Sequence, residues 1–196
     1  TTWPVTTNDP LSSNLRNLWD TRGPEDTGVA GKGVSPWPVG GYGTKAPALW
    51  PATQGGGVTV AVVDTGIINH PDLAPNLVPG YDMISSVVNS NDGDGRDPDA
   101  SDSGSYAAAG QCGTSSEARN SSWHGTHVAG TIGAVANNAT GVVGVAPGVK
   151  LQPVRVLGAC GGSTADVAAG IAWAAGVPVS GLPANPTPAK VINVSL

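Results

Sequence analysis

Residues 58–66 have the sequence Val-Thr-Val-Ala-Val-Val-Asp-Thr-Gly, and three glycines at 55–57 come before them. This short, β-branched and apolar run between glycines is typical of a strand that is buried on both faces, as strands of parallel sheets are. The run ends on the carboxylate of Asp64. Ligand chemistry in open α/β sheets gathers at the carboxyl ends of strands, so the stretch predicts an α/β fold with a functional site at Asp64.

The second informative stretch, residues 121–133, reads Ser-Ser-Trp-His-Gly-Thr-His-Val-Ala-Gly-Thr-Ile-Gly. We expect a helix in which Ser121 and Ser122 cap the first free amides, and small residues allow close packing against neighbouring backbone. His124 then lies in the first turn. A carboxylate can hold one ring nitrogen of a histidine while the other accepts a proton, which makes His124 a candidate general base. A purely structural histidine is the alternative.

Further segments extend the α/β pattern. Residues 149–157 and 191–196 are apolar and β-branched enough for two more buried strands. Residues 166–175 predict an amphipathic helix between them, with Ile171 and Trp173 among its buried side chains.

Residues 1–50 differ from the rest because glycine and proline interrupt them often. We interpret them as an N-terminal arm that lies on a core formed by residues 51–196. Four tryptophans are expected to anchor the arm as large apolar side chains: Trp3, Trp19, Trp37 and Trp50.

The composition limits the class of protein. A chain with 29 glycines, 17 prolines and 5% aromatic residues is a turn-rich α/β protein rather than a helical bundle. Charged residues make up 12% and the net charge is -5, which argues against nucleic acid and against a membrane surface as partners. No apolar run reaches transmembrane length, and the first residues lack a signal-peptide pattern.

The two cysteines, Cys112 and Cys160, stand in loops rich in glycine and serine, where a buried inert thiol is uncommon. We expect a disulfide between them, which places the protein in an oxidising compartment such as the extracellular space. Two unrelated free thiols are the alternative.

Residues 91–102, the acidic loop, carry closely spaced aspartates: Asp92, Asp94, Asp97, Asp99 and Asp102. Carboxylates this close repel one another unless a cation or solvent screens them, and calcium is the natural hard cation for such oxygens. The spacing does not meet the EF-hand pattern. A solvated acidic surface loop is the alternative.

Several motifs, in their order, resemble those of the subtilisin-like serine proteases. Asp-Thr-Gly at 64–66 and His-Gly-Thr-His-Val-Ala-Gly-Thr at 124–131 carry most of the resemblance. The others are His-Pro-Asp-Leu at 70–73, Gly-Val-Val-Gly-Val-Ala-Pro at 141–147, Val-Arg-Val-Leu-Gly at 154–158 and Val-Ile-Asn-Val-Ser-Leu at 191–196. Together they cover residues 50–196.

The resemblance implies a subtilisin-like three-layer α/β fold with a mostly parallel central sheet, of which residues 1–196 form the N-terminal part. It also implies a secreted endopeptidase that hydrolyses peptide bonds by acyl transfer, with Asp64 and His124 as members of its catalytic triad. The family's nucleophile stands in a Gly-Thr-Ser-Met-Ala motif, which does not occur in the 196 residues. We therefore expect the serine on the C-terminal remainder of the same domain, as a second chain or a cleaved segment.

The resemblance further implies how substrate binds. Gly161 and Gly162 would lend their backbone to an extended polypeptide, and Ser195 and Leu196 would line the primary specificity pocket.

A calcium site is also implied by the resemblance. The family's strong site would use the side chains of Asp72 and Asn138, with carbonyl oxygens of Ala136, Thr140 and Val142.

Two other functions fit parts of the sequence. A non-catalytic, calcium-stabilised binding scaffold would explain the acidic loop, and a serine-directed covalent probe would distinguish it from a protease. A metalloenzyme using Asp64, His124 and His127 is the other, because neutral histidines three residues apart can bind zinc. No His-Glu-x-x-His motif supports it, and metal analysis after chelation would test it.

Overall fold

The computed structural model describes residues 7–15, 18 and 43–196. Within these residues the strands are β1 (Thr59–Asp64), β2 (Tyr81–Asp82), β3 (Lys150–Arg155) and β4 (Val191–Val194). The α-helices are α2 (Val87–Ser90), α3 (His124–Gly133) and α4 (Thr164–Ala174), and short 3-10 turns occupy Ser12–Asn14, Ala46–Ala48 and Ala74–Asn76. No helix of this described part is long and apolar enough to cross a membrane.

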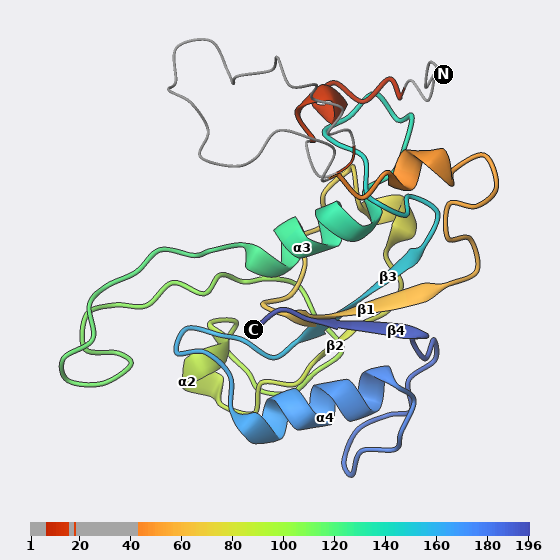
Figure 1. Cartoon of the computed structure of the whole chain (residues 1–196). Helices are drawn as coiled ribbons and strands as arrows, with labels where there is room; N and C mark the ends of the chain where they lie inside the picture. The colour runs from red at the N-terminus through yellow and green to blue at the C-terminus, as the bar shows by residue number, and fades with distance from the viewer. Residues whose placement is uncertain (1–6, 16–17, 19–42) are drawn as a thin grey trace, which may run out of the picture.

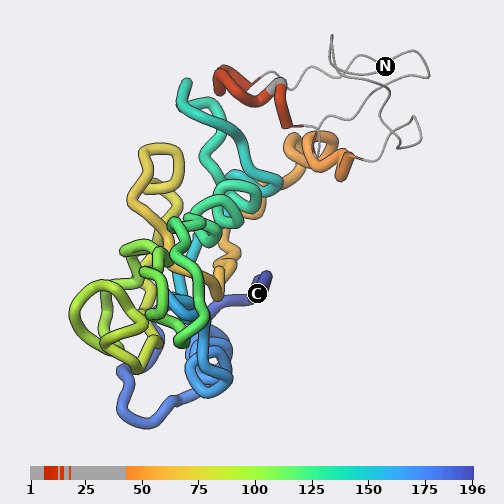
Figure 2. The backbone as a smooth tube through the Cα atoms, turned by 90° about the vertical axis from the view of Figure 1, so that its left-hand side faces the viewer, coloured from red at the N-terminus to blue at the C-terminus, as the bar shows by residue number. Residues whose placement is uncertain are grey.

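The strands form one sheet in the order β2-β3-β1-β4, and every neighbouring pair is parallel. Helix α3 covers one face of the sheet and α4 the other, as two views at right angles show (Figures 1 and 2). The parallel registers place Asp64 beside Arg155 and Val63 beside Val194. The predicted three-layer α/β fold is therefore confirmed for the described residues.

Strand β1 explains why both faces of the sheet are covered. Val60 and Val62 point into the apolar cluster under α3, whereas Ala61 and Val63 belong to the cluster under α4. All four side chains are buried, so polar and apolar residues do not alternate along this strand. The continuous apolar run in the sequence is the direct result.

The start of helix α3 differs from the prediction. Its N-cap is Trp123 in the left-handed conformation (φ 53°), without a side-chain cap. The amide of Gly125 instead donates to the Thr65 hydroxyl, at 3.0 Å, just beyond β1. The predicted capping by Ser121 and Ser122 is wrong, because a residue 60 positions away in the sequence supplies the acceptor.

Helix α4 is predicted well except at one side chain. Its N-cap Ser163 accepts a hydrogen bond from the Asp166 amide at 3.0 Å, so the helix begins two residues earlier than expected. Trp173 is buried in the cluster under the sheet, as predicted. Ile171 is 36% exposed, so its predicted burial is wrong.

The arm is described only in part. Trp50 is buried, and its indole N–H donates to the Val145 carbonyl at 3.0 Å, in line with the predicted anchor. The other predicted anchors, Trp3, Trp19 and Trp37, lie outside the described residues.

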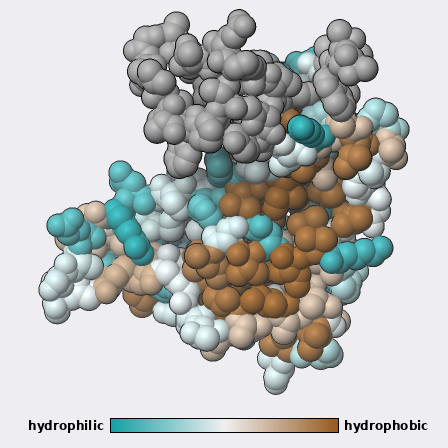
Figure 3. Space-filling view, in the orientation of Figure 1, coloured by the Kyte–Doolittle hydropathy of each residue, from teal (hydrophilic) through white to brown (hydrophobic). Residues whose placement is uncertain are grey.

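One edge of the sheet carries exposed apolar side chains. Among the described strands, β4 pairs only with β1. Val191 and Val194 are 51% and 45% exposed, and Leu196 follows them at 57%. In Figure 3 apolar residues gather on this face, over β4.

Candidate active site

Asp64 and His124 meet where β1 ends and α3 begins. The Nδ1 atom of His124 lies 2.9 Å from both carboxylate oxygens of Asp64. The Asp64 side chain is fully buried, whereas the His124 side chain is 44% exposed. A buried carboxylate that holds one ring nitrogen leaves the rest of an exposed imidazole available to a substrate, which is the arrangement of a general base and its orienting acid.

Thr65 ties this pair to the acidic loop. The Thr65 hydroxyl donates to the Asp102 carboxylate at 2.7 Å and accepts from the Gly125 amide at 3.0 Å. The Thr65 amide donates to Asp64 at 2.7 Å. Helix α3 also lies very close to the end of β1, because a Cβ on Gly125 would stand 2.3 Å from the Gly66 carbonyl. Sequence reasoning missed Thr65, although it stands inside the Asp-Thr-Gly motif.

The aspartates of the acidic loop have protein partners. Arg155, fully buried at the end of β3, contacts the carboxylates of both Asp82 and Asp92. Asp97 and Asp99 each accept an amide two residues on, at 2.8 and 3.0 Å.

The two carboxylates that share Arg155 behave differently. Burial raises the pKa of Asp82 to about 7, although the Ile84 amide and the Arg155 charge both lower it. Partial burial also raises the pKa of Asp92, but a Ser90 hydrogen bond and the Arg155 charge outweigh it and hold that pKa below its usual range. A single guanidinium therefore serves two acids, and the deeper burial of Asp82 gives its carboxyl the higher pKa of the two.

The predicted calcium ligands around Asp72 lie close together. The buried Asp72 carboxylate accepts from the Asn138 side-chain amide at 2.9 Å and from the Val142 amide at 2.8 Å. The carbonyls of Ala136, Thr140 and Val142 accept no hydrogen bond from any residue that the structure describes. Carboxylate and carbonyl oxygens are the kind of donor that calcium takes, so the residue types are compatible with the predicted site.

The next question is whether side chains alone form a metal site. Throughout residues 7–15, 18 and 43–196, no three His, Cys, Asp or Glu side chains gather in a way that could hold a metal ion. His127 is exposed on α3. The zinc alternative thus gains no support here, and calcium in the acidic loop stays a prediction.

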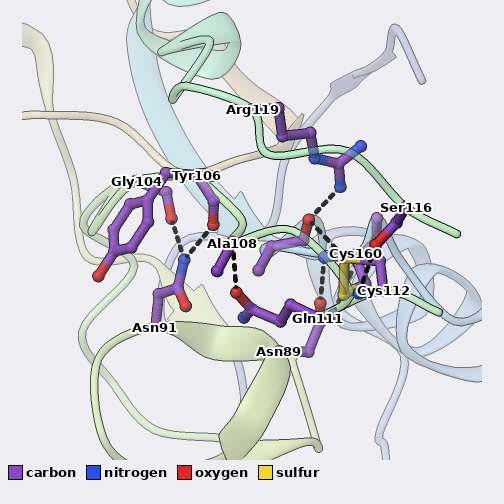
Figure 4. Close-up of a disulfide and its surroundings, with 12 residues drawn as sticks. Asn89, Asn91, Gly104, Tyr106, Ala108, Gln111, Cys112, Ser116, Arg119 and Cys160 are labelled. Carbon is purple, nitrogen blue, oxygen red and sulfur yellow. Dashed lines mark hydrogen bonds between the residues drawn. A yellow bond between two sulfur atoms is a disulfide. The ribbon is translucent and has the colours of Figure 1, made fainter. Parts of the chain in front are cut away.

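The predicted disulfide between Cys112 and Cys160 is confirmed. It joins the tethered loop (residues 107–119), which is mostly exposed, to the edge loop (residues 158–162), which is partly buried, as Figure 4 shows. A pair of antiparallel hydrogen bonds between Ala107 and Arg119 closes the base of the tethered loop.

Two of the predicted substrate-binding residues, Ser195 and Leu196, directly follow a strand, whereas Gly161 and Gly162 lie in the edge loop beyond β3. Gly162 follows β3, and a Cβ there would lie 2.7 Å from the Val156 carbonyl, so only glycine fits without a shift. Ser195 and Leu196 follow β4, which is parallel to β1. Because carboxyl ends of parallel strands meet at one edge of a sheet, these residues share that edge with Asp64.

One Gly-Thr-Ser triplet does occur, at 113–115, but Ser-Glu rather than Met-Ala follows it. It is exposed in the tethered loop beside Cys112. Among the described residues no hydrogen bond connects it to His124.

Known proteins match this chain in sequence. The family model described as Subtilase family matches residues 55–196. An extracellular protease of Xanthomonas campestris pv. campestris is 56% identical over 147 residues, which are 75% of this chain and 25% of that protein. An extracellular basic protease of Dichelobacter nodosus is 51% identical over 162 residues, or 80% of this chain and 27% of that protein.

A solved structure extends the similarity to the fold. A protease from Pseudoalteromonas arctica superimposes with a TM-score of 0.81 at 51% identity. The match covers 97% of this chain and 50% of that one. The chain thus spans half of the solved protein and about a quarter of the two sequence relatives.

Proposed function

The chain belongs to the subtilase family, and on this premise we propose that it forms the N-terminal part of the catalytic domain of a secreted serine endopeptidase. One observation carries the proposal. The buried Asp64 carboxylate lies 2.9 Å from Nδ1 of a half-exposed His124, on a fold that is homologous to extracellular proteases.

The reaction is acyl transfer to a serine. His124 takes the hydroxyl proton of the serine as that oxygen attacks the peptide carbonyl, and it gives the proton to the leaving amine. Asp64 fixes the ring and stabilises the imidazolium that forms. Water then hydrolyses the acyl-enzyme with His124 again as base. The serine and its oxyanion hole come from a segment beyond these 196 residues.

The substrate is an extended polypeptide. Gly162, in the edge loop, offers backbone to it, and Ser195 and Leu196 offer backbone next to the end of β4. The neighbouring Gly161 is already paired with Gly158 and Asn89, and it holds the loop in shape. Strand addition of this kind gains affinity from main-chain hydrogen bonds and is tolerant of side chains. The exposed apolar surface over β4 is where the rest of the domain would pack.

Calcium would be held at Asp72. Its carboxylate and the nearby carbonyls of Ala136, Thr140 and Val142 supply hard oxygen donors, and the Asn138 side chain stands beside them. When bound, the ion would cross-link the segment after β1 to the segment after α3 and stabilise the fold. The acidic loop, residues 91–102, is a second place for calcium that the same titration would detect.

Two observations support secretion as part of the proposal: the disulfide and the names of the relatives. A bond between Cys112 and Cys160 persists in oxidising compartments, and both sequence relatives are named extracellular proteases.

The test is to produce the chain together with the C-terminal half of the domain, which carries the Gly-Thr-Ser-Met-Ala motif, and to follow casein hydrolysis. His124→Ala should lower kcat/KM by roughly 10³-fold or more. His127→Ala is the matched control, because His127 is exposed one turn further along the same helix.

Three outcomes decide the proposal. Full activity in His124→Ala would refute the role of the base. An inactive complex that does not react with a serine-directed covalent probe would favour a calcium-stabilised binding scaffold. Activity of the 196-residue chain alone, shown by mass to be free of other polypeptides, would place the nucleophile within it.

A further inference from the structure

We propose that Asn89, on the short helix α2, is a positioning residue that holds the edge loop in the conformation that binds substrate. This inference rests on the proposed function, in which the edge loop pairs with the polypeptide through Gly162. Asn89 lies 71 residues before Cys160 and belongs to none of the motifs in the sequence.

Asn89 contacts three consecutive residues of the edge loop. Its side-chain oxygen accepts the Cys160 amide at 2.6 Å, and its side-chain nitrogen donates to the Gly161 carbonyl at 2.8 Å. Its main-chain carbonyl accepts the Ala159 amide at 2.8 Å. One residue thus mimics a strand partner and uses both ends of its side-chain amide, as Figure 4 shows in part.

The loop is also closed on itself. Gly158 and Gly161 exchange hydrogen bonds at 3.1 and 3.2 Å. A Cβ on Gly158 would lie 1.9 Å from the Asn89 carbonyl, so α2 and the edge loop are in direct backbone contact.

These contacts decide what remains for a ligand. The backbone amides of residues 158–161 all donate hydrogen bonds to Asn89 or to one another. In the described residues the amide and carbonyl of Gly162 take part in no hydrogen bond. An incoming peptide would therefore meet a loop that is already held in shape by Asn89. The free amide and carbonyl of Gly162 would be available to pair with it.

Other anchors keep the region folded without the Asn89 side chain. Arg119 contacts the Ala159 carbonyl, and the disulfide ties Cys160 to the tethered loop. Asn91 holds a different segment, because its side-chain nitrogen donates to the carbonyls of Gly104 and Tyr106 at 3.0 and 2.9 Å. Asn91 is also left-handed (φ 63°), which glycine tolerates.

The expected effect is on binding rather than on chemistry. If the edge loop samples other conformations, the apparent affinity for substrate is reduced in proportion to the fraction of molecules whose loop can still bind. When that fraction is about one tenth, KM rises about tenfold. The Asp64–His124 pair has no contact with Asn89 among the described hydrogen bonds, so kcat should stay within about twofold of the parent.

Two variants test this proposal. Asn89→Ala removes the side-chain amide and places a good helix former in α2. Asn91→Gly is the matched control, because it removes two hydrogen bonds to another segment. Hydrogen exchange of the Cys160 amide should accelerate by about tenfold in Asn89→Ala and stay unchanged in Asn91→Gly. This measurement needs no protease activity.

Kinetics of the assembled protease complete the test. For a long peptide substrate KM should rise about tenfold in Asn89→Ala alone. A short ester that does not reach Gly162 should be cleaved at the parent rate by all three proteins. An active parent with unchanged KM in Asn89→Ala, or equal losses on both substrates, would overturn the inference alone. An inactive parent would overturn the proposed function, and this inference with it.

Discussion

Replacing Thr65 by valine removes one hydroxyl from the junction of β1, the acidic loop and α3 while the side chain keeps its shape. Thr65 is 3% exposed and Asp102 6%, so water cannot replace the lost partners. The hydrogen bond to the Asp102 carboxylate is worth about 1.5–3 kcal/mol, and the one from the Gly125 amide about 1 kcal/mol. We therefore expect the free energy of unfolding to fall by about 2.5–4 kcal/mol.

The measurement is urea denaturation of parent and variant. A loss of this size should also lower the melting temperature by roughly 5–15 °C. Thr131→Val is the matched control on α3, because its hydroxyl is exposed and, among the described residues, bonds only to the His127 carbonyl. Its effect should therefore stay within about 0.5 kcal/mol. If Thr65→Val were as stable as this control, the hydroxyl would not join the three elements.

Two further predictions concern bound metal and pH. Chelation should lower the melting temperature and added calcium should restore it, because a ligand that binds only the folded state stabilises that state. Asp72→Asn should abolish most of this response to calcium. An identical response in that variant would mean that calcium binds elsewhere. The pKa of Asp82 is about 7 in the folded protein against 3.8 in the unfolded chain, so its contribution to stability is complete below 3.8 and is lost as the pH rises through 7. Urea denaturation at pH 5 and pH 8 should therefore show Asp82→Asn gaining stability relative to the parent at the higher pH, and a constant difference would mean that Asp82 is already ionised at pH 5.

Local patterns predicted much of this structure. The apolar run at 58–66 specified a buried strand because both of its faces meet helices, and the two cysteines paired as their loop settings suggested. Asp64 and His124 could be named together only because the motif order resembled that of a known family. Their contact at 2.9 Å is a property of the fold.

Several contacts between residues that are far apart in the sequence could not be predicted. Arg155 lies 63 residues from Asp92 and 73 from Asp82, so no local pattern indicates that this guanidinium contacts both carboxylates. The helix cap was misplaced for the same reason, since local serines precede α3 but Thr65 supplies the acceptor. Asn89 carries no local signal at all, because its role depends on a loop that folds back onto α2.

The disulfide has a consequence for survival in the presence of proteases. The tethered loop is mostly exposed, and such loop tips are preferred sites of nicking. Any single cut between Cys112 and Cys160 leaves the two pieces covalently joined, with α3 and β3 both inside the ring. A nicked molecule would keep its parts at high effective concentration, and it would run as one band on a gel without reductant and as two with it.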